Sequence, residues 1–139
     1  MENKIYSING PVVTIKGKTD LAMMEMVYVG KSRLVGEVIR MNDKETTIQV
    51  YEETGGLKAG EPVESTGGPL SVTLGPGILR NIYDGIQRPL EKIVEKVGPN
   101  ITRGVEVPAI DHDKKWPFTP VAKVGDQVTG GDVLGTVPE

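Results

Sequence analysis

Short runs of apolar and β-branched residues fill the first 65 positions, and Gly, Pro, Asn or Asp separates each run from the next. Within the runs, apolar and polar residues tend to alternate, which is the period of a half-buried β-strand. Their spacing of roughly 8–12 residues is typical of small sandwiches and barrels. We therefore predict about six strands closed into a small β-barrel, because closure hides the edges that so short a sheet would expose. The predicted strands cover residues 4–8, 12–15, 24–29, 34–41, 46–51 and 62–65.

The pattern changes after residue 65. Gly67-Gly68-Pro69 predicts a hinge and Gly75-Pro76-Gly77 a second break, and apolar positions over 78–86 allow a turn or two of helix ending at Gly85. Residues 89–97 predict a firmer helix: a first-position proline, an apolar stripe at i, i+3, i+4 and i+7, and a Gly-Pro stop. So short a helix must pack on something to be stable. Residues 104–110, 116–124 and 127–137 return to strand and turn.

Composition supports a mainly β chain and excludes several partners. The 139 residues include 18 Gly and 10 Pro but only 4% aromatics, which favours short strands and tight turns over long helices. A net charge of −3 offers no basic surface for nucleic acid or an anionic membrane. There is no cysteine for disulfides or thiolate metal sites. We expect no signal peptide and no transmembrane run, so any link to a membrane would come through a partner.

Two tripeptides, Gly17-Lys18-Thr19 and Gly30-Lys31-Ser32, resemble the end of a phosphate-binding loop. Such a loop needs a glycine five residues before the Gly-Lys pair and a helix after it. The required positions hold Val12 and Glu25, and the second tripeptide leads into a predicted strand. We therefore interpret both as turns.

Other polar clusters are also better explained as turns. Asp111-His112-Asp113 contains the only histidine, and no further His or Cys completes a zinc site. Glu52-Glu53 could form an acid–base pair, but adjacent strand residues point to opposite faces. The sequence therefore predicts no catalytic, cofactor-binding or metal-binding residue in this chain.

Two C-terminal segments admit more than one interpretation. Trp116-Pro117-Phe118 holds the only Trp and Phe; buried it would anchor a small core, which we favour, and exposed it would be a partner-binding hot spot. Residues 124–137 contain a near-repeat, Val-Gly-Asp-x-Val and then Gly-Gly-Asp-Val-Leu, and are similar to the entry hairpin of lipoyl or biotinyl barrel-sandwich domains. The simpler interpretation of this second segment is a turn-rich hairpin.

Taken in order, several short motifs resemble the N-terminal part of the catalytic A subunit of the V-type and A-type rotary ATPases. The resemblance spans residues 4 to 139, and its N-terminal and central motifs are 10–13, 24–27, 34–40, 48–54, 60–63, 70–77 and 82–90. Residues 103–105, 116–120 and 131–139 look like the insertion that separates A subunits from F-type β subunits. Asp20-Leu21-Ala22 departs mildly from the family's small-residue turn.

This resemblance implies a division into three parts. Residues 1–67 would form the barrel that joins A and B subunits into the crown of the A3B3 hexamer. Residues 68–101 would be a linker and short helix entering the nucleotide-binding domain. Residues 102–139 would begin the insertion, a partial barrel-sandwich associated with the peripheral stalk.

The resemblance also implies which functions belong to the parent subunit. It would couple ATP hydrolysis or synthesis to proton or sodium transport using Mg-ATP, in a cytoplasmic head peripheral to the membrane. The family's P-loop lysine, catalytic glutamate and adenine-contacting aromatic match nothing up to Glu139, so this fragment would serve assembly, without a cofactor and inactive alone. Residues from about 111 onward are expected to be poorly ordered or paired with another copy. The alternative is a freestanding barrel adaptor with a lipoyl-like hairpin.

Overall fold

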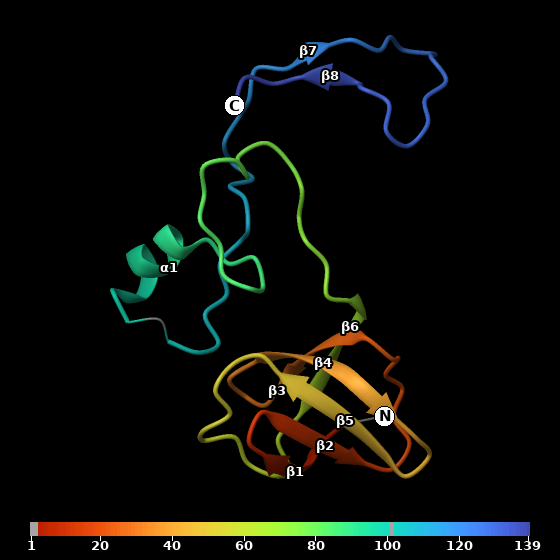
Figure 1. The fold of residues 1–139 in the computed structure, drawn as a ribbon, viewed down its shortest axis with the longest axis vertical. Helices are drawn as coiled ribbons and strands as arrows, with labels where there is room; N and C mark the ends of the chain where they lie inside the picture. The colour runs from red at the N-terminus through yellow and green to blue at the C-terminus, as the bar shows by residue number, and fades with distance from the viewer. Residues whose placement is uncertain (1–2, 101) are drawn as a thin grey trace. The chain divides into compact units, whose positions relative to one another are not determined.

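Six strands in the first 69 residues pair into one antiparallel sheet (Figure 1). The computed structural model describes residues 3–100 and 102–139, and its contacts divide the chain into two units: residues 1–71 with 97–106, and residues 72–96 with 107–139. The sheet has the strand order β1-β2-β5-β4-β3-β6. Its strands are β1 (Ile5–Asn9), β2 (Val12–Lys16), β3 (Glu25–Val29), β4 (Leu34–Met41), β5 (Glu45–Val50) and β6 (Val63–Pro69).

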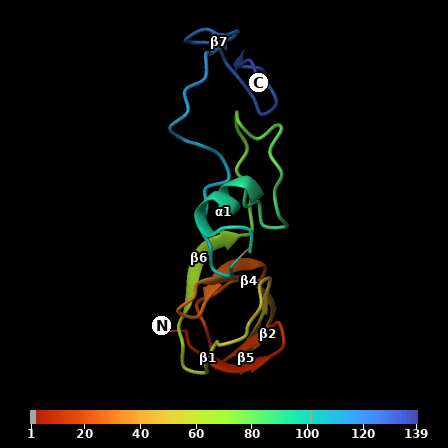
Figure 2. The same cartoon turned by 90° about the vertical axis from the view of Figure 1, so that its left-hand side faces the viewer.

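The two outer strands of this sheet, β1 and β6, meet through a short seam. Lys4 and Pro62 form an antiparallel bridge. The amide of Ile5 donates to the Glu61 carbonyl at 2.9 Å, and the amide of Val63 donates to the Asn3 carbonyl at 2.8 Å. Seen along the barrel, the strands form a ring (Figure 2). The predicted six-strand barrel is confirmed, and its closure relies on this seam rather than on a full ladder between β1 and β6.

The core of the barrel consists of inward-facing aliphatic side chains. In β3 and at the start of β4 every second residue is buried, as the strand period requires. Each fully buried Val, Leu or Ile stabilises the fold by roughly 1.5–3 kcal/mol. The cluster comprises Ile5, Val13, Ile15, Leu21, Val27, Val29, Leu34, Val38, Ile48, Val50 and Val63.

Two glycine positions show how closely the strands approach and where the chain leaves the barrel. A Cβ on Gly36 in β4 would lie 2.9 Å from Ile48 Cγ2 and 3.0 Å from the Gln49 carbonyl oxygen, so only glycine fits there without a shift. The predicted hinge Gly67-Gly68-Pro69 lies inside β6, where the pairing with β3 shifts register between Glu25 and Val27. Gly67 has a φ of 78° at this irregularity.

In the second unit, the helix α1 (Leu90–Val97) follows Pro89, as predicted, and buries Ile93. The only other regular structure described there is a two-stranded antiparallel sheet of β7 (Thr119–Pro120) and β8 (Gly135–Thr136). Of the strand and turn predicted over 104–110, 116–124 and 127–137, the structure forms strand only in β7 and β8, and most of the remaining residues have irregular backbone. Carboxylates cap two of these turns, with the Lys123 amide donating to Asp126 and the Thr129 amide to Asp132.

The turn or two of helix predicted for residues 78–86 is wrong. The carboxylate of Asp84 accepts hydrogen bonds from the amides of Ile86 at 3.1 Å and Arg88 at 2.9 Å, which competes with helical hydrogen bonding. Arg80 and Gln87 have φ of 66° and 62°, a left-handed conformation that stops a helix. The apolar spacing in this segment therefore marks a series of turns.

The three-part division at residues 67 and 101 stays a prediction, as does poor order or pairing with another copy from residue 111. Within this single chain, Thr119 pairs with Thr136 and Pro120 with Gly135.

Candidate functional site

Both Gly-Lys tripeptides lie in connections that follow a strand, and backbone amides in each donate to oxygen atoms of the protein itself. The amide of Gly17 donates to the Lys44 carbonyl at 2.6 Å. In the turn between β3 and β4, the amide of Gly30 donates to the Pro62 carbonyl at 2.8 Å and that of Lys31 to the Glu61 carboxylate at 3.1 Å. A strand, β4, follows this second turn, so no helix N-terminus is present to hold a phosphate.

The two acidic clusters are also turn and surface features. Asp111 Oδ1 accepts from the amides of Asp113 at 2.9 Å and Lys114 at 3.2 Å, and all three residues of the cluster are exposed. Among residues 3–100 and 102–139, no group of three potential metal ligands occurs. Glu52 is half-buried and accepts from the Gly104 amide at 2.9 Å, whereas Glu53 is exposed.

The prediction that Trp116 and Phe118 anchor a core is wrong for Phe118. Its side chain is 59% exposed and lies across Gly135 of β8, where an added Cβ would collide with the ring. Trp116 is half-buried, and the Lys114 ammonium lies 4.1 Å from the centre of its indole ring. The strands β7 and β8 have only two residues each, so the small sheet they form offers little surface to cover the Phe118 ring.

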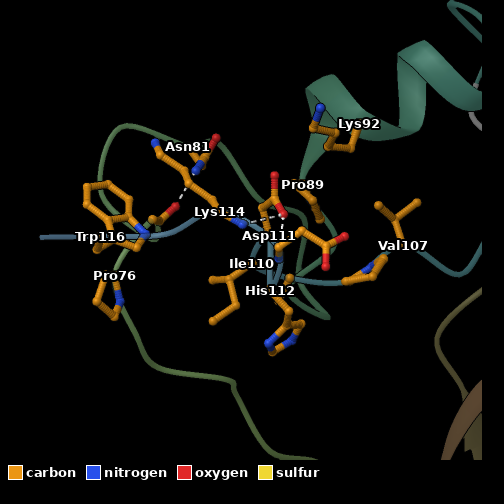
Figure 3. Close-up of a pocket in the computed structure, with 14 residues that line it drawn as sticks. Pro76, Asn81, Pro89, Lys92, Val107, Ile110, Asp111, His112, Lys114 and Trp116 are labelled. Atoms are coloured by element: carbon orange, nitrogen blue, oxygen red, sulfur yellow. Dashed lines mark hydrogen bonds between the residues drawn. The ribbon is translucent and has the colours of Figure 1, made fainter.

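A cavity of about 400 Å³ lies within the second unit (Figure 3). Pro76, Pro89, Val107 and Ile110 give it an apolar lining, and Trp116 adds a partly buried aromatic surface. Its lining also includes the charged residues Lys92, Asp111, Asp113 and Lys114, together with His112. Within this lining, the Asp111 carboxylate accepts hydrogen bonds from the backbone amides of Asp113 and Lys114.

A buried carboxylate in the barrel escaped the sequence reasoning. Glu25 is only 5% exposed, and it accepts hydrogen bonds from the Ala22 amide at 2.7 Å, the Gly67 amide at 3.2 Å and the Ser65 hydroxyl. Burial alone would raise the pKa of Glu25, but these hydrogen bonds together lower it below the ordinary value. Glu25 shares its strand face with Val27 and Val29, and that alternation was the signal that could have found it.

The motif over residues 82–90 contains a partly buried ion pair. Arg88 Nε lies 2.7 Å from Asp84 Oδ2, and the side chains are 14% and 21% exposed. Burial acts to raise the pKa of Asp84, but the amide and guanidinium of Arg88 and the amide of Ile86 lower it overall. The pair therefore fixes the turn before α1 rather than offering a free acid.

The barrel surface carries exposed apolar side chains that the core does not use. Met23, Met24 and Ile39, which we call the methionine patch, are 52%, 56% and 39% exposed. The Met24 amide donates to the Val38 carbonyl at 2.9 Å, which places Met24 beside β4. Methionine is enriched at protein–protein interfaces, so this patch is a candidate contact surface. No helix among the described residues is long and apolar enough to cross a membrane.

Comparison with known sequences identifies the two folded parts as domains of one family. A sequence model of the ATP synthase alpha/beta family, beta-barrel domain, matches residues 5–67, and one of the ATP synthase alpha/beta barrel-sandwich domain matches residues 107–139. In solved structures, the fold is similar to that of the assembled ATPase EscN from the type III secretion system of enteropathogenic E. coli. That likeness has a TM-score of 0.59 at 24% identity, and covers 73% of this chain and 24% of EscN.

Curated relatives narrow the family. The chain is 61% identical to the catalytic A subunit of the V-type proton ATPase of Neurospora crassa, over 98% of this chain and 23% of that protein. It is 55% identical to the V-type ATP synthase alpha chain of Acetivibrio thermocellus, over 99% and 23%. Identity to the A subunit of the A-type ATP synthase of a Desulfurococcus species is 56%, over 98% and 23%. The chain belongs to the family of V-type and A-type ATPase catalytic A subunits, as their N-terminal barrel region, and spans about a quarter of these relatives' length.

Proposed function

We propose that this chain is the assembly part of an A subunit, and that its barrel joins A and B subunits into the crown of an A3B3 head. The observation that carries this proposal is 61% identity to the catalytic polypeptide of a V-type proton ATPase over almost the whole chain. A complete parent would couple ATP hydrolysis or synthesis to proton or sodium transport, in a cytoplasmic head peripheral to the membrane.

The construction of the barrel supports an assembly role. Its aliphatic core is buried inside one closed sheet, so the barrel needs no partner to complete that core. The methionine patch remains outside the core, and such side chains gain most from being covered by a partner. A stiff collar of this kind would hold subunits together while nucleotide-driven motions occur elsewhere in the parent.

The second unit has a separate proposed role. Residues 107–139 match the barrel-sandwich domain, and several of their apolar side chains, including Val121, Val128 and Val133, are more than half exposed. We assign this segment to the base of the insertion that the family associates with the peripheral stalk. Mg-ATP would bind in the parent, at residues with no counterpart in this chain.

The assembly role can be tested by mixing this chain with the B subunit from the same organism and measuring the mass of the complex by light scattering. The double variant Met23→Asp/Ile39→Asp should weaken association at least tenfold, about 1.4 kcal/mol, because it places charge in the contact. Val124→Asp, at a fully exposed position of the second unit, is the matched control. Unchanged association of the double variant would contradict a contact through the methionine patch.

The absence of a nucleotide function in this chain is tested by calorimetric titration with Mg-ATP. We expect no heat of binding. Micromolar affinity would show that the chain itself holds a nucleotide site, and the proposed division between assembly and chemistry would then be wrong.

A further inference from the structure

Residues 103–106 return to the barrel after the chain has left it. The compact unit that contains the barrel includes residues 97–106, although the barrel strands end at residue 69. The Gly104 amide donates to the Glu52 carboxylate at 2.9 Å, just beyond β5. Arg33 Nε donates to Glu106 Oε1 at 3.1 Å, from the turn between β3 and β4. The returning segment therefore contacts two different turns of the barrel.

Arg33 is held in place by the barrel itself before it meets Glu106. Its amide donates to the Gly30 carbonyl at 3.0 Å, and its guanidinium lies 4.1 Å from the centre of the Tyr28 ring. It also pairs with Glu64, which is opposite Tyr28 in the β3–β6 register. These contacts fix the position of the Arg33 guanidinium, a cation that the returning segment meets through Glu106.

Gly104 makes the closest approach to the barrel. Its φ is 69°, and a Cβ at this position would collide with the carbonyl oxygen of Ser32. On the other side, Arg103 covers the turn at Gly55 and Gly56, with its guanidinium 3.0 Å from where a Gly56 Cβ would be. Only glycine allows two backbones to approach so closely, so the fit at Gly104 specifies the docked position.

We propose that residues 103–106 form a strap whose docking site is the pair of barrel turns at 30–33 and 52–56. The chain therefore contacts the barrel at two places, along β6 and again at the strap. Residues 72–96 lie between these two attachments in the sequence. The ion pair of Arg33 and Glu106 is exposed, and exposed pairs contribute little to stability. The close fit of Gly104 and its hydrogen bond to Glu52 therefore carry most of the docking. This proposal rests on the geometry of the barrel unit and is independent of the ATPase assignment.

Limited trypsin digestion of the whole chain tests the strap, because trypsin cleaves after Arg103 only when the strap has lifted. Gly104→Ala should speed cleavage at Arg103 about tenfold relative to wild type, when proteolysis follows the population of the open form. Gly98→Ala is the matched control: Gly98 also has a positive φ, 85°, but nothing lies within 4 Å of its added Cβ. It should change the rate less than about twofold. Rates are divided by those of synthetic 97–110 peptides with the same substitutions, which removes the effect of the new residue on trypsin.

Equal normalised rates for Gly104→Ala and Gly98→Ala would overturn the strap, because strain alone would then explain both. Amide exchange at Val27 and Ile48 distinguishes a lifted strap from an unfolded barrel, since both core amides should stay as protected as in wild type. If Gly104→Ala does not fold, Glu52→Ala provides the same test, because it removes the acceptor of the Gly104 amide and adds no trypsin site. It should raise cleavage at Arg103 about tenfold, whereas Glu53→Ala, at the exposed neighbouring position, should change it less than about twofold. No change with Glu52→Ala in that case would refute the docking.

Discussion

The barrel and the second unit are stabilised in different ways. Eleven aliphatic side chains form the buried cluster inside the barrel, whereas in the described part of the second unit the buried apolar residues are Pro89 and Ile93. There, carboxylates capping turns replace burial: Asp84, Asp111, Asp126 and Asp132 each accept backbone amides. The comparison teaches that the barrel should unfold as one cooperative unit, while the second unit should open turn by turn.

The largest effect is expected from truncating the barrel core. Leu34→Ala should lower the free energy of unfolding by about 3 kcal/mol, because Leu34 is fully buried and the cavity cannot collapse in a closed sheet. Val133→Ala, at an exposed position of the second unit, should change it by less than about 0.5 kcal/mol. Urea unfolding measures both. Similar losses at the two sites would remove the distinction between the units.

A smaller loss is expected from adding volume at the tightest strand crossing. Gly36→Ala should lower the free energy of unfolding by about 2 kcal/mol, since its Cβ would press on Ile48 and the β5 backbone. Gly68→Ala is the comparison, because nothing lies within 4 Å of its Cβ and its φ is not left-handed. Thermal unfolding of the two variants should separate them clearly. A stable Gly36→Ala protein would mean that β4 and β5 can move apart, and that the core is less rigid than its packing indicates.

The buried carboxylate of Glu25 should make the stability of the barrel depend on pH, and the substitution Glu25→Gln should remove that dependence. The lowered pKa of Glu25 contributes stability that is present above its unfolded value, near 4.5, and is lost as pH falls through the lowered folded value. Glu25→Gln should lower the free energy of unfolding by about 2 kcal/mol at pH 7, because a charged acceptor of three hydrogen bonds is lost. Urea unfolding from pH 7 to pH 3 should show wild type and variant converging in acid. A constant difference would mean that the Glu25 charge is not the cause.

The smallest effect is expected in the second unit and should remain local. Asp84→Asn removes the ion pair with Arg88 and should weaken the turn before α1 by about 1 kcal/mol. Hydrogen exchange should accelerate at the amides of Ile86 and Arg88 but not in the barrel core. Faster exchange at Val27 as well would show that the two units unfold together.

The sequence predicts the structure of the barrel better than that of the second unit. The six strands of the barrel could be predicted because alternation, turn residues and burial all indicate one arrangement, and each lies within a residue or two of its observed bounds, except for β6, which continues to Pro69. The helix after Pro89 could be predicted for the same reason, because its first-position proline, its apolar stripe and the Gly-Pro that ends it all agree. The helix prediction for residues 78–86 was wrong because it relied on apolar spacing alone. The backbone conformation there is set by the hydrogen bonds of the Asp84 side chain and by the left-handed conformation of Arg80 and Gln87. No periodic signal marks such capping.

The candidate sites were harder to predict than the fold. Sequence spacing was sufficient to place both Gly-Lys tripeptides in turns, because a phosphate loop requires partners at fixed positions. Burial of Phe118 could not be judged, since it depends on neighbours that come together only in three dimensions. The contact of Gly104 with Ser32 and Glu52 joins residues far apart in the chain, so no local pattern could predict it.

The seam at Lys4 and Pro62, between β1 and β6, is the weakest junction between strands in the barrel. Every other junction between neighbouring strands is a ladder of several residue pairs, so the ring would open first at this seam, which one bridge and three backbone hydrogen bonds hold together. Parting there would leave two unpaired strand margins, each able to receive the complementary strand of another molecule. An opening of this seam would therefore create strand edges suited to exchange between two copies of the chain.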